Sequence, residues 1–96
     1  MKIKYEKKVI KFLAKMEKSV VDNIKEAIKG LLENPPKGDI KPLSGYKDER
    51  KRLRHGKYRI IFRNDEVKKT TENKEESIKI LLIMDIGSRG DIYKEG

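Results

Sequence analysis

The spacing of apolar residues changes along the chain, and each spacing predicts a different element. Ile3 and Tyr5 alternate with charged residues, which predicts a short first strand. Over residues 7–18, and again over residues 20–34, apolar side chains recur every three or four positions, as on one face of a helix. Ser19 is the expected N-cap of the second helix, and a pair of prolines ends that helix.

The second half of the chain has the shorter periodicity of strands. Strands are expected at residues 50–55, 58–63 and 77–86. The first two flank His55-Gly56, which is expected to form a two-residue hairpin turn because glycine tolerates positive φ. The polar segments at residues 35–48 and 64–76 are expected to be loops.

The order of these elements is β-α-α-β-β-β. It predicts one α+β domain over residues 1–96, with a helical hairpin packed on one face of a mainly antiparallel four-stranded sheet. The last strand contains apolar residues on both of its sides at residues 80–84, which is typical of a central strand covered on both faces.

Composition excludes several classes of protein. The 96 residues include no cysteine and one histidine, so disulfides, zinc-thiolate sites and multi-histidine metal sites are excluded. No apolar run approaches the roughly 20 residues of a membrane span, and the N-terminus has no apolar signal sequence. We therefore expect a cytoplasmic domain with no cofactor, no metal site and no membrane contact.

Positive charge is concentrated in the centre of the chain. The formal net charge is +9, and residues 46–63 alone carry eight basic residues against two acidic ones. All six arginines lie in the second half of the sequence, whereas the helical first half uses only lysine. Because a guanidinium is a planar fork that matches phosphate oxygens, this segregation indicates a binding surface. The alternative is a solvated charged face without a ligand.

A turn at His55-Gly56 places Arg52 directly opposite Arg59. Leu53 and Tyr58 then point toward the helices. The basic side chains that point to the other face are Arg50, Arg52, Arg54, Lys57, Arg59 and Arg63. Like charges opposite one another are unfavourable, so this face is expected to bind a polyanion such as a nucleic acid. A slip of one residue in one strand would instead separate the arginines.

The segment after the last strand contains Arg89 and, four residues later, Tyr93. Both are expected to lean over the edge of the basic face, where a tyrosine can stack on a base or transfer a proton. The alternative is that Tyr93 packs on the core while Arg89 pairs with Asp85 or Asp91.

Three segments resemble the RelE/ParE superfamily of bacterial and archaeal toxins, and in particular its RelE branch. They are Pro42-Leu43-Ser44-Gly45, the hairpin at residues 52–62, and the terminal segment at residues 86–93. The resemblance covers nearly the whole chain and agrees with the predicted order of elements.

The resemblance implies a toxin of a type II toxin–antitoxin system that cleaves mRNA in the ribosomal A site. In such toxins the 2′-hydroxyl of the RNA attacks the adjacent phosphate without a metal. The implied catalytic residues are Arg52, Arg59, Arg89 and Tyr93, and the implied RNA-binding residues are Arg50, Arg54, Lys57 and Arg63. The implied partners are a cognate antitoxin, the small ribosomal subunit and mRNA.

One departure from the family leaves the proton transfers open. RelE-like toxins often carry lysines where this chain has Arg50 and Arg52, and arginine does not release its proton. Tyr93 and His55 remain as titratable candidates. Two other functions also remain open: gyrase inhibition by a ParE-like toxin, and RNA or ribosome binding without cleavage.

Overall fold

A sheet of five strands, in the order β1-β5-β4-β3-β2, forms the framework of the protein. The computed structural model describes residues 2–88. Its elements are β1 (Lys2–Tyr5), α1 (Lys7–Ala14), α2 (Lys18–Gly30), β2 (Asp39–Pro42), β3 (Lys51–His55), β4 (Tyr58–Thr71) and β5 (Lys74–Ser88). The predicted α+β class is confirmed, whereas the expected count of four strands is wrong. β1 pairs parallel with β5, and the other neighbours are antiparallel.

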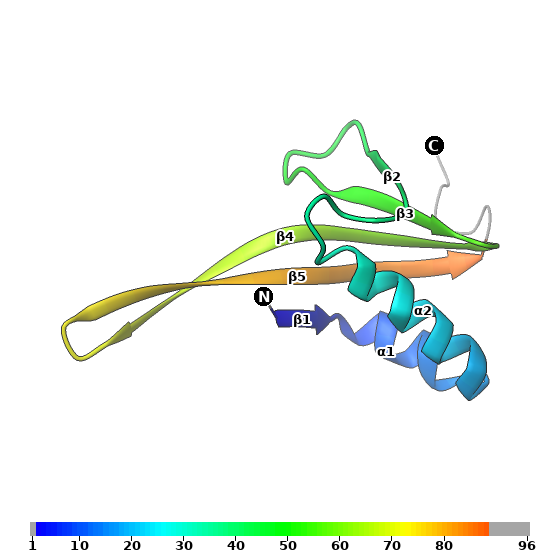
Figure 1. Ribbon diagram of the computed structural model, residues 1–96, viewed down its shortest axis with the longest axis horizontal. Coiled ribbons are helices and arrows are strands. Elements are labelled where there is room, and N and C mark those ends of the chain that lie inside the picture. Colours follow the sequence, from blue (N-terminus) through cyan, green and yellow to red (C-terminus); the bar gives the residue numbers. More distant parts are fainter. Residues whose placement is uncertain (1, 89–96) are drawn as a thin grey trace.

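Both helices cover the same face of the sheet, as Figure 1 shows. The helices and the sheet share one apolar core, and its most deeply buried members are Val9, Ile24, Ile28, Leu53, Ile60, Leu81 and Ile83. Full burial of a side chain of this size contributes about 1.5–3 kcal/mol. This layer therefore anchors β3, β4 and β5, and within residues 2–88 no helix covers their opposite face.

The helix boundaries differ from those expected. α1 ends at Ala14, and Glu17 rather than Ser19 is the N-cap of α2. Glu17 has an extended backbone with ψ of 151°, so the helix starts at Lys18 and places Ser19 inside its first turn. No side chain caps this helix start. The capping pattern in the sequence therefore predicted the helix but not its first residue.

β2 lies within the segment that was expected to be a loop. Ile40 pairs with Leu53 of β3 and packs against the core. The strand is short, contributes one apolar residue, and ends at Pro42, which is tolerated because the strand lies at an edge of the sheet. These features leave almost no periodicity in the sequence, so the prediction of a loop was wrong.

β5 lies between β1 and β4, which confirms its predicted interior position. The expectation that both of its faces are covered holds only in part. Ile83 packs in the core, and Leu82, which points to the opposite face, is also buried. Among residues 2–88, however, no helix or strand packs over that second face.

β4 and β5 continue far past the other strands, where a loop was expected. They pair as far as Thr71↔Lys74, and their distal part projects from the body as a narrow ribbon (Figure 1). We call residues 63–71 and 74–79 the arm. Cross-strand pairs of opposite charge, Glu66↔Lys79 and Lys69↔Glu76, support the arm in place of a core. Polar strands of this kind are not distinguished from a loop by hydrophobic periodicity.

Candidate nucleic-acid interface

Five arginines lie on the face of the sheet that the helices do not cover. We call this surface the arginine face: Arg50, Arg52, Arg54, Arg59 and Arg63. Side chains alternate between faces along each strand, and Leu53 and Ile60 point into the core. Their neighbours Arg52, Arg54 and Arg59 must therefore point away from the helices. The predicted grouping of the arginines on one face agrees with the structure.

The register within this hairpin differs from the prediction. Arg54, not Arg52, lies directly opposite Arg59, and Arg52 lies opposite Ile61. The turn is formed by Gly56 and the residue after it, because His55 remains in β3 and pairs with Tyr58. Gly56 has a φ of 60°, in the left-handed region that glycine favours. The two like charges are therefore adjacent as expected, but they come from a different pair of residues.

A small hollow opens beside this pair at the tip of the hairpin. Its volume is about 160 Å³, and its lining residues are Arg54, Gly56, Lys57 and Arg59. All three side chains with charge are cationic. The hollow therefore suits a small anionic group, such as a phosphate of a nucleic acid backbone.

Three carboxylates approach the arginine face, and their role was not predicted from the sequence. Asp39 of β2 accepts a hydrogen bond from Arg54 Nε at 3.0 Å and one from Arg52 Nη2 at 3.4 Å. The positive charges of Arg52 and Arg54 are therefore partly compensated within the chain, because Asp39 lies between these two guanidiniums.

The second carboxylate, Asp48, lies in the loop before β3. It accepts hydrogen bonds from Arg50 Nε at 2.9 Å and from Arg50 Nη2 at 2.8 Å. Its Oδ2 also lies 3.7 Å from Arg63 Nε. The hydrogen bonds from Arg50 lower the pKa of the Asp48 carboxyl and raise the pKa of the guanidinium. The Arg50 guanidinium also lies 4.1 Å from the centre of the Tyr46 ring.

Positive charge still exceeds negative charge on this face. Arg63 also approaches Asp65, at 3.6 Å, so five guanidiniums face three carboxylates. Arg52 is only 7% exposed. Within residues 2–88, the buried Nε atoms of Arg52 and Arg63 donate no hydrogen bond. Buried donors usually have a partner, so the guanidiniums of Arg52 and Arg63 are incompletely hydrogen-bonded within the described chain.

A family model that describes the ParE toxin of the type II toxin–antitoxin system parDE matches residues 3–93. The chain belongs to this family of toxins. The match supports the broad RelE/ParE superfamily that the sequence motifs indicate, and it does not identify the RelE branch. No curated protein and no solved structure gives a significant match.

His55 is not part of the toxin's arginine face. Its Nε2 lies 3.2 Å from Asn23 Oδ1 of α2, on the side of the sheet that the helices cover. Tyr58 points the same way, since its ring packs edge-on against Phe12 at 6.2 Å. His55 is therefore removed from the candidate proton donors and acceptors. Arg89 and Tyr93 lie outside the residues that the structure describes.

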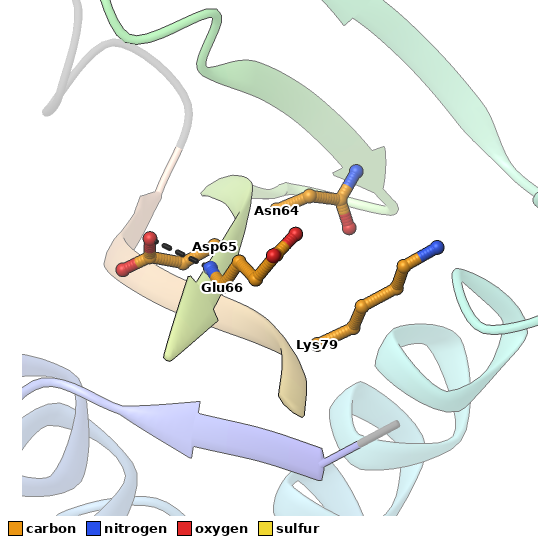
Figure 2. Close-up of a pocket in the computed structure, with 4 residues that line it drawn as sticks. All are labelled: Asn64, Asp65, Glu66 and Lys79. Carbon is orange, nitrogen blue, oxygen red and sulfur yellow. Dashed lines mark hydrogen bonds between the residues drawn. The ribbon is translucent and has the colours of Figure 1, made fainter. Parts of the chain in front are cut away.

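A second hollow in the toxin lies at the base of the arm and has a different character. Figure 2 shows Asn64, Glu66 and Lys79 on one side of the ribbon, with the Asp65 carboxylate turned away from them. Asp65 accepts a hydrogen bond from its neighbour's backbone, Glu66 N, at 2.8 Å. The mixed charges make this hollow unlike the cationic one at the hairpin tip.

Residues 2–88 contain no cluster of histidine and carboxylate side chains that would hold a metal ion. Neither of the two helices is long and apolar enough to span a bilayer.

Proposed function

We propose that this ParE-family toxin is a ribosome-dependent endoribonuclease that cleaves mRNA in the A site. The observation that carries the proposal is the arginine face, with Arg54 and Arg59 side by side at a hollow of phosphate size. RNA binds such a surface because neutralising each phosphate releases counterions. Its partner as a toxin of this class is a cognate antitoxin.

In this proposal, the carboxylates of the arginine face occupy the positions that RNA phosphates take when RNA binds. Arg54 and Asp39 are each about half exposed, and exposed ion pairs contribute only about 0–1 kcal/mol. A phosphate offers the guanidinium the same bidentate geometry as a carboxylate. Exchange of Asp39 for an RNA phosphate therefore costs little, and it leaves the sheet unchanged.

The chemistry required is attack by a 2′-oxygen on the adjacent phosphorus. The pentavalent phosphorane carries extra negative charge, and we assign its stabilisation to Arg52 and Arg59. Removal of one such donor costs on the order of 3 kcal/mol in other enzymes. Arg54 lines the same hollow as Arg59, so it holds the neighbouring phosphate together with Lys57.

The remaining assignments complete the site. Arg50 and Arg63 bind the RNA backbone toward the base of the arm. Arg89 neutralises the leaving 5′-oxygen, and Tyr93 stacks on a base or acts as the general base. The ribosome supplies the in-line orientation of the RNA, which an open sheet does not hold alone. The proposed reaction uses no metal or cofactor and takes place in the cytoplasm.

Two rival functions remain, and the family match does not decide between them and the proposal. The family model describes the toxin of parDE, and a ParE-like toxin inhibits DNA gyrase. An RNA-binding or ribosome-binding role without cleavage is the other alternative. Both share the cationic face but predict no cut in mRNA.

Cleavage mapping on stalled ribosomes separates the three functions. Ribosomes carrying one defined codon in the A site are incubated with the toxin, and the mRNA ends are located by primer extension. The proposal predicts a cut within that codon, and no cut when the attacking nucleotide is 2′-deoxy. Breaks in DNA that depend on gyrase, with intact mRNA, would support gyrase inhibition. Ribosome binding with intact mRNA would leave only the non-catalytic role.

A further inference from the structure

The arm exposes an edge of β4 that no strand covers. β3 pairs with β4 only as far as Phe62, and β1 lies beside β5. Within the described chain, the outer edge of β4 from Arg63 to Thr71 therefore has its backbone hydrogen-bonding groups unpaired by another strand. An exposed edge of this length is a template for a further strand.

The side chains on this edge form a charge pattern with inverted symmetry. Two acids, Asp65 and Glu66, precede Val67, and two bases, Lys68 and Lys69, follow it. An antiparallel strand of the same sequence, centred on the same valine, presents this pattern in reverse. Each acid then meets a base.

We propose that the occupant of this edge is the same edge of a second copy of the chain, related by a two-fold axis at Val67. In this register Glu66 lies opposite Lys68 of the second copy, and Asp65 lies opposite Lys69 of the second copy. The symmetry doubles these contacts to four cross-strand ion pairs. Interfaces with two-fold symmetry require this kind of self-complementarity.

The existing pairs of the arm fit the same register. Lys79 of β5 lies opposite Glu66 within one chain. In the dimer, Lys68 of the second copy lies on the other side of Glu66, so the charges alternate in sign across these three strands. On the other face of the arm, Val67 pairs with Ile78. Val67 is 46% exposed in the single chain. Dimerisation brings the two Val67–Ile78 pairs together and removes this apolar surface from water.

The proposed register ends where β3 begins to pair with β4. Asn64 lies opposite Thr70 of the second copy and Arg63 lies opposite its Thr71, so the paired segment stops at Arg63, next to Phe62, which pairs with Lys51 of β3. A hollow of about 160 Å³, lined by Asp48, Glu49, Lys51 and Asn64, lies beside this point.

Charge argues against a nucleic acid as the occupant of the arm. Residues 64–79 carry four lysines and five acidic residues, in contrast to the cationic arginine face. The edge of β5 in the arm is less complementary, because an antiparallel pairing centred on Ser77 sets only Glu75 opposite Lys79 of the second copy, which gives two ion pairs instead of four. Pairing through β4 also keeps both arginine faces on the same side of one continuous sheet.

Sedimentation equilibrium of the full chain tests the proposal with charge reversals. Lys68→Glu places two acidic side chains opposite each other in the dimer, at positions 66 and 68. The double variant Glu66→Lys with Lys79→Glu keeps an ion pair within each arm. It places two basic side chains opposite each other across the dimer, again at positions 66 and 68. Each variant exchanges two attractive pairs for two repulsive ones, so we expect its dissociation constant to rise about tenfold. The triple variant restores opposite charges across the axis, and we expect it to recover the wild-type dissociation constant.

Lys25→Glu is the matched control, because it makes the same change of charge at an exposed site on α2, away from the arm. It is expected to dimerise like the wild-type chain. A wild-type chain that remains monomeric at every concentration would overturn the proposal. So would a Lys68→Glu variant that dimerises as tightly as the control, or a triple variant that fails to recover although its thermal unfolding matches that of the control.

Discussion

Asp39 offers a sharp test of how the arginine face works, because its carboxylate is predicted to stabilise the free toxin and to compete with RNA. Asp39→Asn removes the negative charge between Arg52 and Arg54 without changing the size of the side chain. The same substitution is therefore expected to lower stability and to raise affinity for RNA.

The size of the stability loss follows from the two contacts. The pair with Arg54 is half exposed and contributes about 0.2–1 kcal/mol. Arg52 is buried, but its hydrogen bond is long at 3.4 Å, so its contribution lies near the lower end of the range of about 1.5–3 kcal/mol for charged groups. We expect a total loss of about 2 kcal/mol. A loss of 1 kcal/mol lowers the Tm of a domain of this size by about 4–8 °C.

The affinity for RNA is expected to move in the opposite direction. Removing one like-sign charge about 4 Å from a bound phosphate is worth about 1 kcal/mol in surroundings like water, which is about fivefold in affinity. If one more phosphate is neutralised, the slope of log affinity against log salt steepens by about 0.7 for a single strand. Fluorescence anisotropy with a 2′-O-methyl RNA, which is not cleaved, measures both quantities.

The control for this experiment is Asp22→Asn, the same chemical change in an exposed ion pair on α2. It is expected to leave both the Tm and the affinity for RNA close to wild type. If Asp39→Asn binds RNA no better than wild type at low salt, Asp39 does not occupy the position of an RNA phosphate, and this part of the proposal is refuted.

Three further predictions concern other parts of the toxin. Asp48→Asn should destabilise the toxin near neutral pH. Calorimetry should show this deficit shrink only below about pH 4, the ordinary range of a carboxyl, and vanish below the lowered pKa of Asp48 in the folded toxin, where protonation removes the same contact from the wild type. Gly38→Ala should lower the free energy of unfolding by at least about 2 kcal/mol in chemical denaturation, because φ is 121° and the added Cβ would lie 2.5 Å from Leu53 Cδ1. Gly45→Ala should lower it less, because the space around Gly45 is open, although its φ is 88°. Arg59→Ala should abolish translation arrest in a cell-free assay while circular dichroism shows an intact fold, and arrest at wild-type strength would contradict its catalytic assignment.

The shared face of the arginines was predictable because it depends only on the alternation of side chains along each strand. Arg52 and Arg54 in β3 have even residue numbers, and Arg59 and Arg63 in β4 have odd residue numbers, so each pair shares one face of its strand. Moving the turn forward by one residue shifts both strands together and preserves this relation. The prediction that these arginines share one face is therefore correct, although the predicted turn was wrong.

The register itself was not predictable from local residues. Gly56 fits a turn with either neighbour, so the local sequence does not choose between them. Contacts distant in the sequence favour the observed turn: His55 meets Asn23 of α2, and Tyr58 packs against Phe12 of α1. Asp39 was missed for the same reason, since only the fold brings it to Arg52 and Arg54, whereas Asp48 lies two residues from Arg50 in the sequence.

The arm and β2 were missed because neither is stabilised chiefly by burial. Hydrophobic periodicity detects strands that contribute to a core, and the arm beyond Arg63 contributes one exposed apolar pair, Val67↔Ile78. Its charge pairs, which support the ribbon across its two strands, become visible only when β4 and β5 are aligned.

The central claim is that the arginine face holds an RNA phosphate chain. The measurement that tests it most directly is an NMR titration of the arginine Nε–H signals with an uncleavable 2′-O-methyl RNA. The account predicts saturable shifts at Arg52, Arg54 and Arg59, and none at the ring of His55 on the opposite face. Shifts confined to the helix-covered side, with the arginine signals unmoved, would contradict it.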